Sequence, residues 1–186
     1  GTHGKTTTTG MLVDIFSQNQ EKFSALVGSK LLGHNNQNYI INQNSKVFIA
    51  EACEYQGGFL NYQPETLVIT NLEHEHFDSF PSQKSYLENF QKLINQTQKN
   101  LILNQECKLS RNLAIPPHLK VTYFNTQTPY QHHQKIDHNN SNANAASTAA
   151  YLYGIEEKII KEAIANFKGT QRRQEIIYQS QKLTII

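Results

Sequence analysis

The sequence predicts an α/β fold in which a mostly parallel sheet is flanked by helices. Short apolar runs rich in Val, Ile and Leu alternate along the chain with segments of helical periodicity. Such runs are typical of strands covered on both faces, and strands that alternate with helices are typical of a parallel sheet. A third observation agrees with this fold class. The chain opens on GTHGKTTTTG, a glycine- and threonine-rich stretch that leads into a helical pattern.

Four apolar runs are expected to form the sheet. They are KVFIAEA, TLVITN, NLILN and LKVTYF, at residues 46–52, 66–71, 100–104 and 119–124. Helices are expected at residues 5–18, 82–96, 141–153 and 156–167. The tail is expected to form a hairpin with strands at residues 175–178 and 182–186. The chain has 186 residues and neither an internal repeat nor a long linker, so a single domain is expected over residues 1–186.

Composition excludes several classes of partner. The formal net charge is +2 and the basic residues are scattered, which gives no electrostatic footprint for nucleic acid or a membrane surface. No run approaches the length of about 18 apolar residues that a membrane span needs. The two cysteines, Cys53 and Cys107, form neither a disulfide framework nor a CxxC motif, and they fit a reducing cytosol. We therefore expect a cytoplasmic protein without a nucleic-acid or membrane partner.

The opening stretch has the residue types of a phosphate-binding loop. Glycine lets backbone N–H groups turn toward phosphate oxygens, Lys5 can reach the terminal phosphates, and the hydroxyl of Thr6 can bind Mg²⁺. The helix that follows would turn its positive end to the anion. The candidate loop residues are Gly1, Thr2, His3, Gly4, Lys5, Thr6 and Thr7. The alternative is a Gly/Thr-rich turn that arose by chance.

The loop pattern is incomplete at its start. A further glycine is usual five residues before the Gly4-Lys5 pair, and a hydrophobic strand usually feeds such a loop; neither precedes Gly1 in this sequence. We therefore expect the chain to be one part of a longer protein.

Acidic residues follow the first apolar run, in the stretch EACE. Glu51 ends this predicted strand, and ligands bind at the carboxyl edge of a parallel sheet. A carboxylate in that place can hold Mg²⁺ directly or through water. Glu51 is the better candidate, and Glu54 follows it. The alternative is a pair of solvated glutamates at the end of a strand.

The next predicted strand runs into NLEHEHFD and so reaches the same edge. Residues 73–78 hold two histidines and three acids, which raises the possibility of zinc. The histidines lack the i, i+4 spacing of HExxH, and no cysteine lies beside them. A magnesium-site residue or a phosphate contact is the better interpretation, and a polar surface turn is the alternative.

Two further polar clusters are weaker signals. His138 and Asn142 lie before the alanine-rich helix and could contact an adenine edge. N-capping of that helix explains the same residues and is the favoured alternative. Arg172 and Arg173 could clamp phosphates, or could be an ordinary solvated basic pair.

Taken together, five motifs in one order resemble a known family. The chain resembles the central ATP-binding domain of the Mur ligases over residues 1–182. The motifs that carry the resemblance are, in order, GTHGKTTTT, EACEYQGGFLNYQP, VITNLEHEHFD, HNNSNANAA and FKGTQRRQE. Within that family the motifs are most similar to those of members that join L-alanine to UDP-N-acetylmuramic acid. Members that join a tripeptide to the same sugar nucleotide are the closest alternative.

The resemblance implies an ATP- and Mg²⁺-dependent ligase that works through an acyl phosphate. Its implied roles can be given residue by residue. For the phosphates, Lys5 contacts the β- and γ-phosphates, Asn71 lies near the γ-phosphate, and Arg173, with Arg172, reaches the phosphates. For magnesium, Thr6 and Glu51 hold one Mg²⁺ and His76 holds a second. For the base, His138 and Asn142 contact adenine. Cys53 replaces an acid common in its motif, while His74 and Glu75 are expected to face solvent. The family's other two domains, for the UDP-sugar and the amino acid, have no counterpart here, so this chain alone is expected to lack ligase activity.

Overall fold

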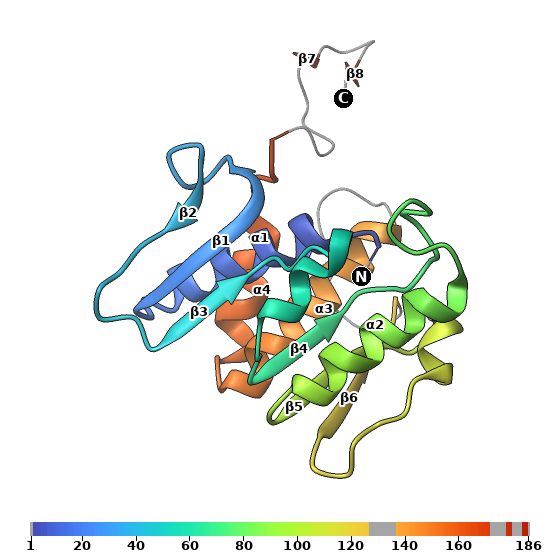
Figure 1. The fold of residues 1–186 in the computed structure, drawn as a ribbon. Coiled ribbons are helices and arrows are strands. Elements are labelled where there is room, and N and C mark those ends of the chain that lie inside the picture. The colour runs from blue at the N-terminus through green and yellow to red at the C-terminus, as the bar shows by residue number, and fades with distance from the viewer. Residues whose placement is uncertain (1, 127–136, 172–177, 180–183, 186) are drawn as a thin grey trace.

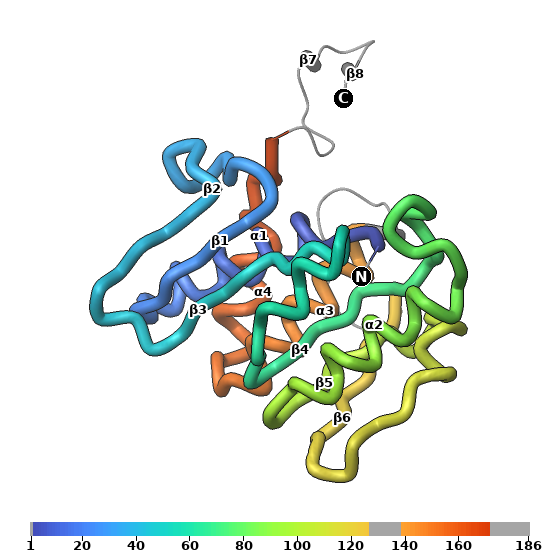
Figure 2. Tube along the Cα trace, viewed as in Figure 1, coloured from blue at the N-terminus to red at the C-terminus, as the bar shows by residue number. Residues whose placement is uncertain are grey.

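The computed structural model describes residues 2–126, 137–171, 178–179 and 184–185 of the chain. Its described part contains two three-stranded sheets, with helices in layers around them, and one short two-stranded ribbon (Figure 1). The expectation of an α/β fold with mainly parallel strands is confirmed. The trace in Figure 2 follows the chain from the first helix through the first sheet and then the second sheet.

Helix α1 (Lys5–Gln18) follows the glycine-rich loop directly and has the bounds that the sequence predicts. Its buried side includes Met11, Ile15 and Phe16, which belong to the first core cluster. Helical spacing brings these side chains to one face, and their burial anchors the helix against the first sheet.

The first sheet has the order β2-β1-β3 and is mixed. Strand β1 (Phe23–Leu31) pairs antiparallel with β2 (Gln37–Ile40) and parallel with β3 (Val47–Ala50). The sequence predicted β3 within residues 46–52 but missed β1 and β2. Strand β1 is buried on only one face, so Ser and Gly alternate with its apolar residues. A search for continuous apolar runs therefore misses it.

The second sheet is parallel throughout, with the order β4-β5-β6. Its strands are β4 (Thr66–Ile69), β5 (Asn100–Asn104) and β6 (Lys120–Phe124), close to the predicted ranges. Helix α2 (Gln83–Gln96) packs on one face and meets Leu101 and Leu103 in the second core cluster. Ile102 turns to the opposite face, as the alternation of a strand requires.

Helix α3 (Asp137–Tyr153) links the two sheets. Ala143, Ala146 and Ala150 are buried with α1 and with α4 (Glu157–Asn166) in the first core cluster. Ala145 is buried with Ile102 of β5 in a third cluster. In Figure 1, α1, α3 and α4 accordingly lie on one side of the sheets and α2 lies on the other. Small side chains let the helix approach both layers closely.

One prediction about the remaining segments needs correction. Helix α3 begins at Asp137, before the predicted start at residue 141, so His138 and Asn142 lie inside the helix rather than ahead of it. The favoured capping interpretation of these residues is therefore wrong. In the tail, β7 (Tyr178–Gln179) pairs antiparallel with β8 (Thr184–Ile185), and the rest of the predicted hairpin lies outside the described residues.

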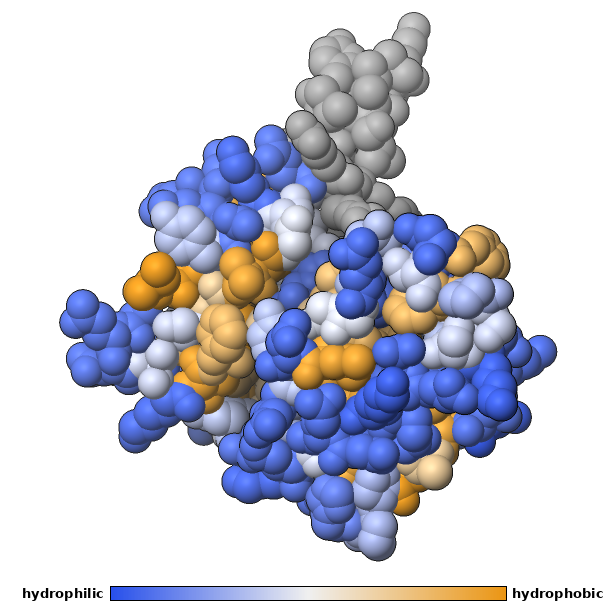
Figure 3. Space-filling view, viewed as in Figure 1, coloured by the Kyte–Doolittle hydropathy of each residue, from blue (hydrophilic) through white to orange (hydrophobic). Residues whose placement is uncertain are grey.

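The described part is completed by two 3₁₀ segments, η1 (Tyr55–Asn61) and η2 (Leu109–Asn112). None of the described helices is long and apolar enough to cross a membrane. Figure 3 shows apolar side chains gathered over the first sheet, on the face turned away from α1. The exposed residues Leu26, Tyr39, Ile41 and Phe48 belong to this region.

Candidate phosphate-binding site

The glycine-rich loop has the backbone shape that its sequence predicts. Gly4 adopts φ 80°, in the left-handed region that L side chains rarely enter. A Cβ built on Gly4 would lie 2.0 Å from Oδ1 of Asn142, so the position excludes a side chain on two grounds. Thr8 Oγ1 also donates to that oxygen, at 3.3 Å. Asn142 of α3 thus lies against the loop.

Glu51 accepts hydrogen bonds from two directions. Thr6 Oγ1 donates to Oε1 at 2.9 Å, and the backbone N–H of Gly28 donates to Oε2 at 2.6 Å. Thr6 and Glu51, which the resemblance assigns to one Mg²⁺, are thus in direct contact in the fold. Both residues sit where the sequence placed them, at the start of a helix and just after β3.

Gly28 is a site residue that the sequence analysis missed. A Cβ on Gly28 would lie 2.6 Å from both carboxylate oxygens of Glu51, so only glycine leaves room for that carboxylate. The available signal was a glycine in the middle of a strand pattern, which often marks a close approach of another group. It went unused because β1 itself was not predicted.

Lys5 and Glu54 form a buried ion pair. The Nζ atom of Lys5 lies 3.0 Å from Oε2 and 3.2 Å from Oε1 of Glu54, and it also donates to the carbonyl oxygen of Thr2 at 3.2 Å. Glu54 is completely buried and the Lys5 side chain is 19% exposed. The alternative of two solvated glutamates after β3 is therefore wrong for Glu54. A charge buried to this degree needs its partner.

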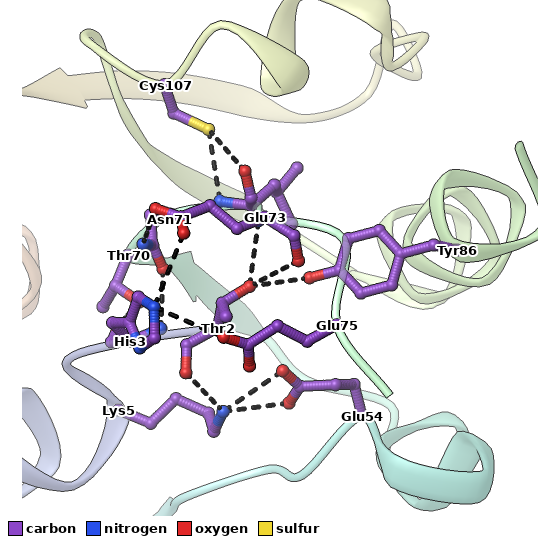
Figure 4. A network of polar contacts seen from close by, with 11 residues as sticks. Thr2, His3, Lys5, Glu54, Thr70, Asn71, Glu73, Glu75, Tyr86 and Cys107 are labelled. Carbon is purple, nitrogen blue, oxygen red and sulfur yellow. Dashed lines mark hydrogen bonds and ion pairs between the residues drawn. The ribbon is translucent and has the colours of Figure 1, made fainter. Parts of the chain in front are cut away.

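The loop also runs along the end of β4. The N–H of Thr2 donates to the carbonyl oxygen of Asn71 at 3.2 Å, and the N–H of His3 donates to the Asn71 side chain at 2.8 Å. Thr70 Oγ1 donates to the carbonyl oxygen of His3 at 2.6 Å. Figure 4 shows these contacts gathered around the loop. The two sheet-edge segments named in the sequence analysis do meet at one place.

The residues after Asn71 pack more closely than expected. The imidazole Nε2 of His3 lies 3.5 Å from Glu73 Oε2 and 3.4 Å from Glu75 Oε1. His74 is partly buried and its Nε2 lies 2.7 Å from the carbonyl oxygen of Phe80. The expectation that His74 faces solvent is wrong, whereas the Glu75 side chain is 38% exposed, as expected.

Thr2 connects this segment to helix α2. Its hydroxyl lies 2.9 Å from the carbonyl oxygen of Glu73, 2.9 Å from the N–H of Glu73 and 2.9 Å from the hydroxyl of Tyr86 (Figure 4). Burial raises the pKa of Tyr86 to about 12, because the anionic phenolate is poorly solvated in the core. Tyr86 lies within the helix predicted at residues 82–96, and the sequence alone gives no sign of this contact.

His76 has an unusual backbone. Its φ is 55°, rare for a residue other than glycine, and its carbonyl oxygen accepts from the N–H groups of Ser79 and Phe80, both at 2.8 Å. The ring packs edge-on against Tyr55 at 5.4 Å. Within the described residues no group of three or more His, Cys, Asp or Glu is arranged to hold a metal ion.

Several expected site residues lie outside the described part of the chain. These are Gly1, Arg172 and Arg173, together with the side chain of His138.

The loop, the helix that it opens and the carboxylate after a neighbouring strand define a phosphate-loop α/β domain. Comparison with known proteins narrows the class. A family model described as the Mur ligase middle domain matches residues 1–184. The chain belongs to this family.

The relatives of the chain are longer proteins. A UDP-N-acetylmuramate–L-alanine ligase of Caldicellulosiruptor saccharolyticus is 33% identical over 94% of this chain and 45% of the relative. A ligase of the same name from Cytophaga hutchinsonii is 28% identical over 100% of this chain and 46% of the relative. The chain thus spans about half the length of these relatives.

Solved structures agree on the fold. The UDP-N-acetylmuramate–alanine ligase of Thermotoga maritima superposes with a TM-score of 0.79 at 21% identity, over 98% of this chain and 47% of the other. A second structure is the UDP-N-acetylmuramate:L-alanyl-γ-D-glutamyl-meso-diaminopimelate ligase of Neisseria meningitides. It superposes with a TM-score of 0.76 at 23% identity, over 92% of this chain and 65% of the other. At such identities the likeness establishes the fold alone.

Proposed function

We propose that this chain is the ATP-binding part of a ligase that joins L-alanine to UDP-N-acetylmuramic acid in peptidoglycan precursor synthesis. The observation that carries the proposal is the arrangement of Lys5, Thr6 and Glu51 around the loop. A cationic amine, a hydroxyl and a carboxylate meet at the N-terminus of α1. The names of the similar ligases support the choice of substrates. The remaining half of such a protein would supply the UDP-sugar and amino-acid sites.

The loop residues would bind the nucleotide phosphates. The first N–H groups of α1 have no partner within the helix and point toward the loop. Gly4 keeps that approach free of a side chain. Lys5 would share its charge between Glu54 and the β- and γ-phosphates, where negative charge develops as the phosphoryl group moves.

Thr6 and Glu51 fit a magnesium ion. Both offer hard oxygen atoms, and these lie 2.9 Å apart. Neighbouring ligands of an octahedral ion with bonds of about 2.0–2.1 Å are separated by about 2.9 Å. When bound, the ion would neutralise phosphate charge. Gly28 would hold the second carboxylate oxygen away from the ion by its N–H.

Other roles depend on the family resemblance. Asn71 lies against the loop, which suits a contact near the γ-phosphate. Asn142 lies against Gly4 and is proposed, with His138, to contact adenine. His76 is proposed to hold a second Mg²⁺. Arg172 and Arg173 are proposed to reach the phosphates.

The proposed reaction has two steps. A carboxylate oxygen of UDP-N-acetylmuramic acid attacks the γ-phosphorus of ATP, and the bond to the β–γ bridging oxygen breaks to release ADP. The amine of L-alanine then attacks the acyl carbon, loses a proton and expels phosphate to leave an amide. The protein's part is to position the reactants and to stabilise the transferring charge.

A second candidate is the ligase that joins a tripeptide to the same sugar nucleotide. It is kept because the motifs GTHGKTTTT and EACEY also resemble those of family members that join a tripeptide. The acceptor separates the two, since both would use the same ATP site.

The test is ADP release by the full-length parent with UDP-N-acetylmuramic acid, ATP and Mg²⁺. We expect release to depend on L-alanine. Dependence on L-alanyl-γ-D-glutamyl-diaminopimelate would replace the first proposal with the second. Release with neither acceptor would refute both. The 186-residue chain alone is expected to bind nucleotide without ligase turnover.

The free cysteines Cys53 and Cys107 fit a reducing compartment, so we place the protein in the cytoplasm. Its near-neutral charge supports small-molecule substrates rather than nucleic acid as partners.

A further inference from the structure

The hydroxyl of Thr2 has all of its hydrogen-bonding capacity in use. A hydroxyl can donate one hydrogen bond and accept two. Thr2 Oγ1 donates to the carbonyl oxygen of Glu73 and accepts from the N–H of the same residue. Oγ1 can therefore accept one more hydrogen bond but cannot donate another. Tyr86, at 2.9 Å, must therefore be the donor.

Tyr86 is well suited to a fixed donor role. It is completely buried, and its ring packs against Phe80 and Phe90 at 5.4 and 4.9 Å. The helix that carries it begins with a capping box in which Ser82 and Ser85 bond to each other's backbone. A tyrosine hydroxyl is protonated at neutral pH even at its ordinary pKa of 10.0, so the donor is always present.

Through Thr2, this donor reaches two parts of the site. Thr2 precedes His3, Gly4 and Lys5 in the loop, and its N–H holds the carbonyl oxygen of Asn71. Glu73 belongs to the segment that continues to His76. Figure 4 shows Thr2 between the Tyr86 ring on one side and the loop on the other.

We propose that Tyr86 is a positioning residue for nucleotide binding, whose hydroxyl acts through Thr2 to set the loop against the segment after β4. This inference rests on the proposed function. It assigns to α2, which contributes no loop residue, the task of fixing the distance between the phosphate loop and residues 73–76. The alternative is that Tyr86 only fills the core, in which case its hydroxyl would not matter for ATP.

The test is the affinity of the full-length parent for MgATP, measured by calorimetry, together with its melting temperature. Tyr86→Phe keeps the ring and removes only the donor. We expect MgATP affinity to fall about tenfold, the order of one lost hydrogen bond. The matched control is Tyr123→Phe, which removes the hydroxyl of an exposed tyrosine on β6 and is expected to leave affinity unchanged.

The contact can also be tested from the loop side. Thr2→Ser keeps the hydroxyl and is expected to bind MgATP normally, whereas Thr2→Val removes it and should weaken binding at least as much as Tyr86→Phe. Combining Thr2→Val with Tyr86→Phe should then cost no more affinity than Thr2→Val alone, because the two changes break one contact.

Two results would overturn the inference: wild-type affinity in Tyr86→Phe, or affinity losses that add in the double variant. Failure of the wild-type parent to bind MgATP would instead overturn the proposed function, so the two failures are distinguishable.

Discussion

Lys5 has two roles in the proposed site, so its removal should affect both ligase turnover and the stability of the fold. Its amine neutralises the buried carboxylate of Glu54 and, in the proposed function, meets the terminal phosphates. Lys5→Ala should lower ligase turnover of the full-length parent by several orders of magnitude, since it removes a cation aimed at developing charge. It should also destabilise the fold by about 3–5 kcal/mol, because Glu54 is left buried without a partner.

A double variant separates the two effects. Adding Glu54→Gln to Lys5→Ala removes the orphaned charge, so stability in urea denaturation should recover in large part while turnover stays low. Turnover of Lys5→Ala within tenfold of wild type would mean that the loop is not the phosphate site.

Gly28 is expected to control the magnesium site from a neighbouring strand. A methyl group at Gly28 would collide with the Glu51 carboxylate, so Gly28→Ala should displace it from Thr6. The Mg²⁺ concentration for half-maximal ADP release should rise about tenfold or more, as for other residues that orient metal ligands. Glu51→Ala should show the same change.

Gly33→Ala is the matched control for this prediction. A Cβ at Gly33 would meet only Asp14 Oδ1, at an ordinary 3.9 Å, so its Mg²⁺ titration should match wild type. An unchanged titration in both Gly28→Ala and Glu51→Ala would move the metal elsewhere.

At the scale of elements, α1 depends on a glycine in its interior. Alanine would normally stabilise a helix interior by about 0.5–1 kcal/mol relative to glycine. A Cβ at Gly10 would, however, lie 3.0 Å from both Leu31 and Thr170 and 3.2 Å from Phe167, which come from β1 and the segment after α4. Gly10→Ala should therefore destabilise the chain by about 1–3 kcal/mol, as overpacking does. A higher denaturation midpoint in this variant would show that these neighbours yield easily.

The burial of Tyr86 in the core gives the fold a pH dependence. The pKa of Tyr86 is about 12 in the folded chain against 10.0 for the free group, so the unfolded state loses this proton first as pH rises. The stabilisation that protonated Tyr86 gives the fold is therefore fully present below pH 10. Between pH 10 and pH 12 the free energy of unfolding falls by up to about 1.4 kcal/mol per pH unit. Urea denaturation of wild type should therefore show a steeper fall in stability from pH 10 upward than Tyr86→Phe does. Parallel pH profiles would mean that Tyr86 ionises in the fold as easily as in water.

Prediction from sequence succeeded where an element's own residues determine it. Strand β5 is buried on both faces, and β4 is buried on one face with Val68 partly buried on the other, so both are visible as apolar runs. Helix α1 and its loop carry their signals locally. Strand β2, QNYI, has mainly polar residues and takes its conformation from pairing with β1, which a local pattern does not report.

The site residues divide in the same way, into those that local sequence predicts and those that depend on contacts distant in sequence. Thr6 and Glu51 were predicted because each ends or begins an element at the ligand-binding edge of a sheet. Gly28 and Tyr86 act through space, across 23 and 84 positions of sequence, so no local spacing marks them. Glu54 was seen as acidic, but its complete burial depends on the packing of η1 and could not be read from EACE.

At the scale of the whole molecule, β3 and β4 are edge strands of different sheets, and residues that follow each of them contact the glycine-rich loop. Among the described residues, β3 pairs only with β1, and β4 pairs only with β5; both edge strands belong to parallel pairs. Contacts through α3 hold the sheets together. The loop reaches the end of β4 at Asn71 through Thr2. A strand that ran into Thr2 would lie between β3 and β4 and would join the two sheets into one.

This geometry predicts the effect of adding a strand before Gly1. A variant with a short added segment rich in Val and Ile should melt at a higher temperature, by about 10 °C, because two or three apolar side chains would be newly buried at about 2 kcal/mol each. It should also unfold in one transition seen alike by circular dichroism and by tyrosine fluorescence. An added segment of equal length rich in Gly and Ser is the control and should not raise the midpoint. Equal midpoints for the two extended variants would mean that the edges of β3 and β4 do not accept a strand, and that α3 alone is what unites the sheets.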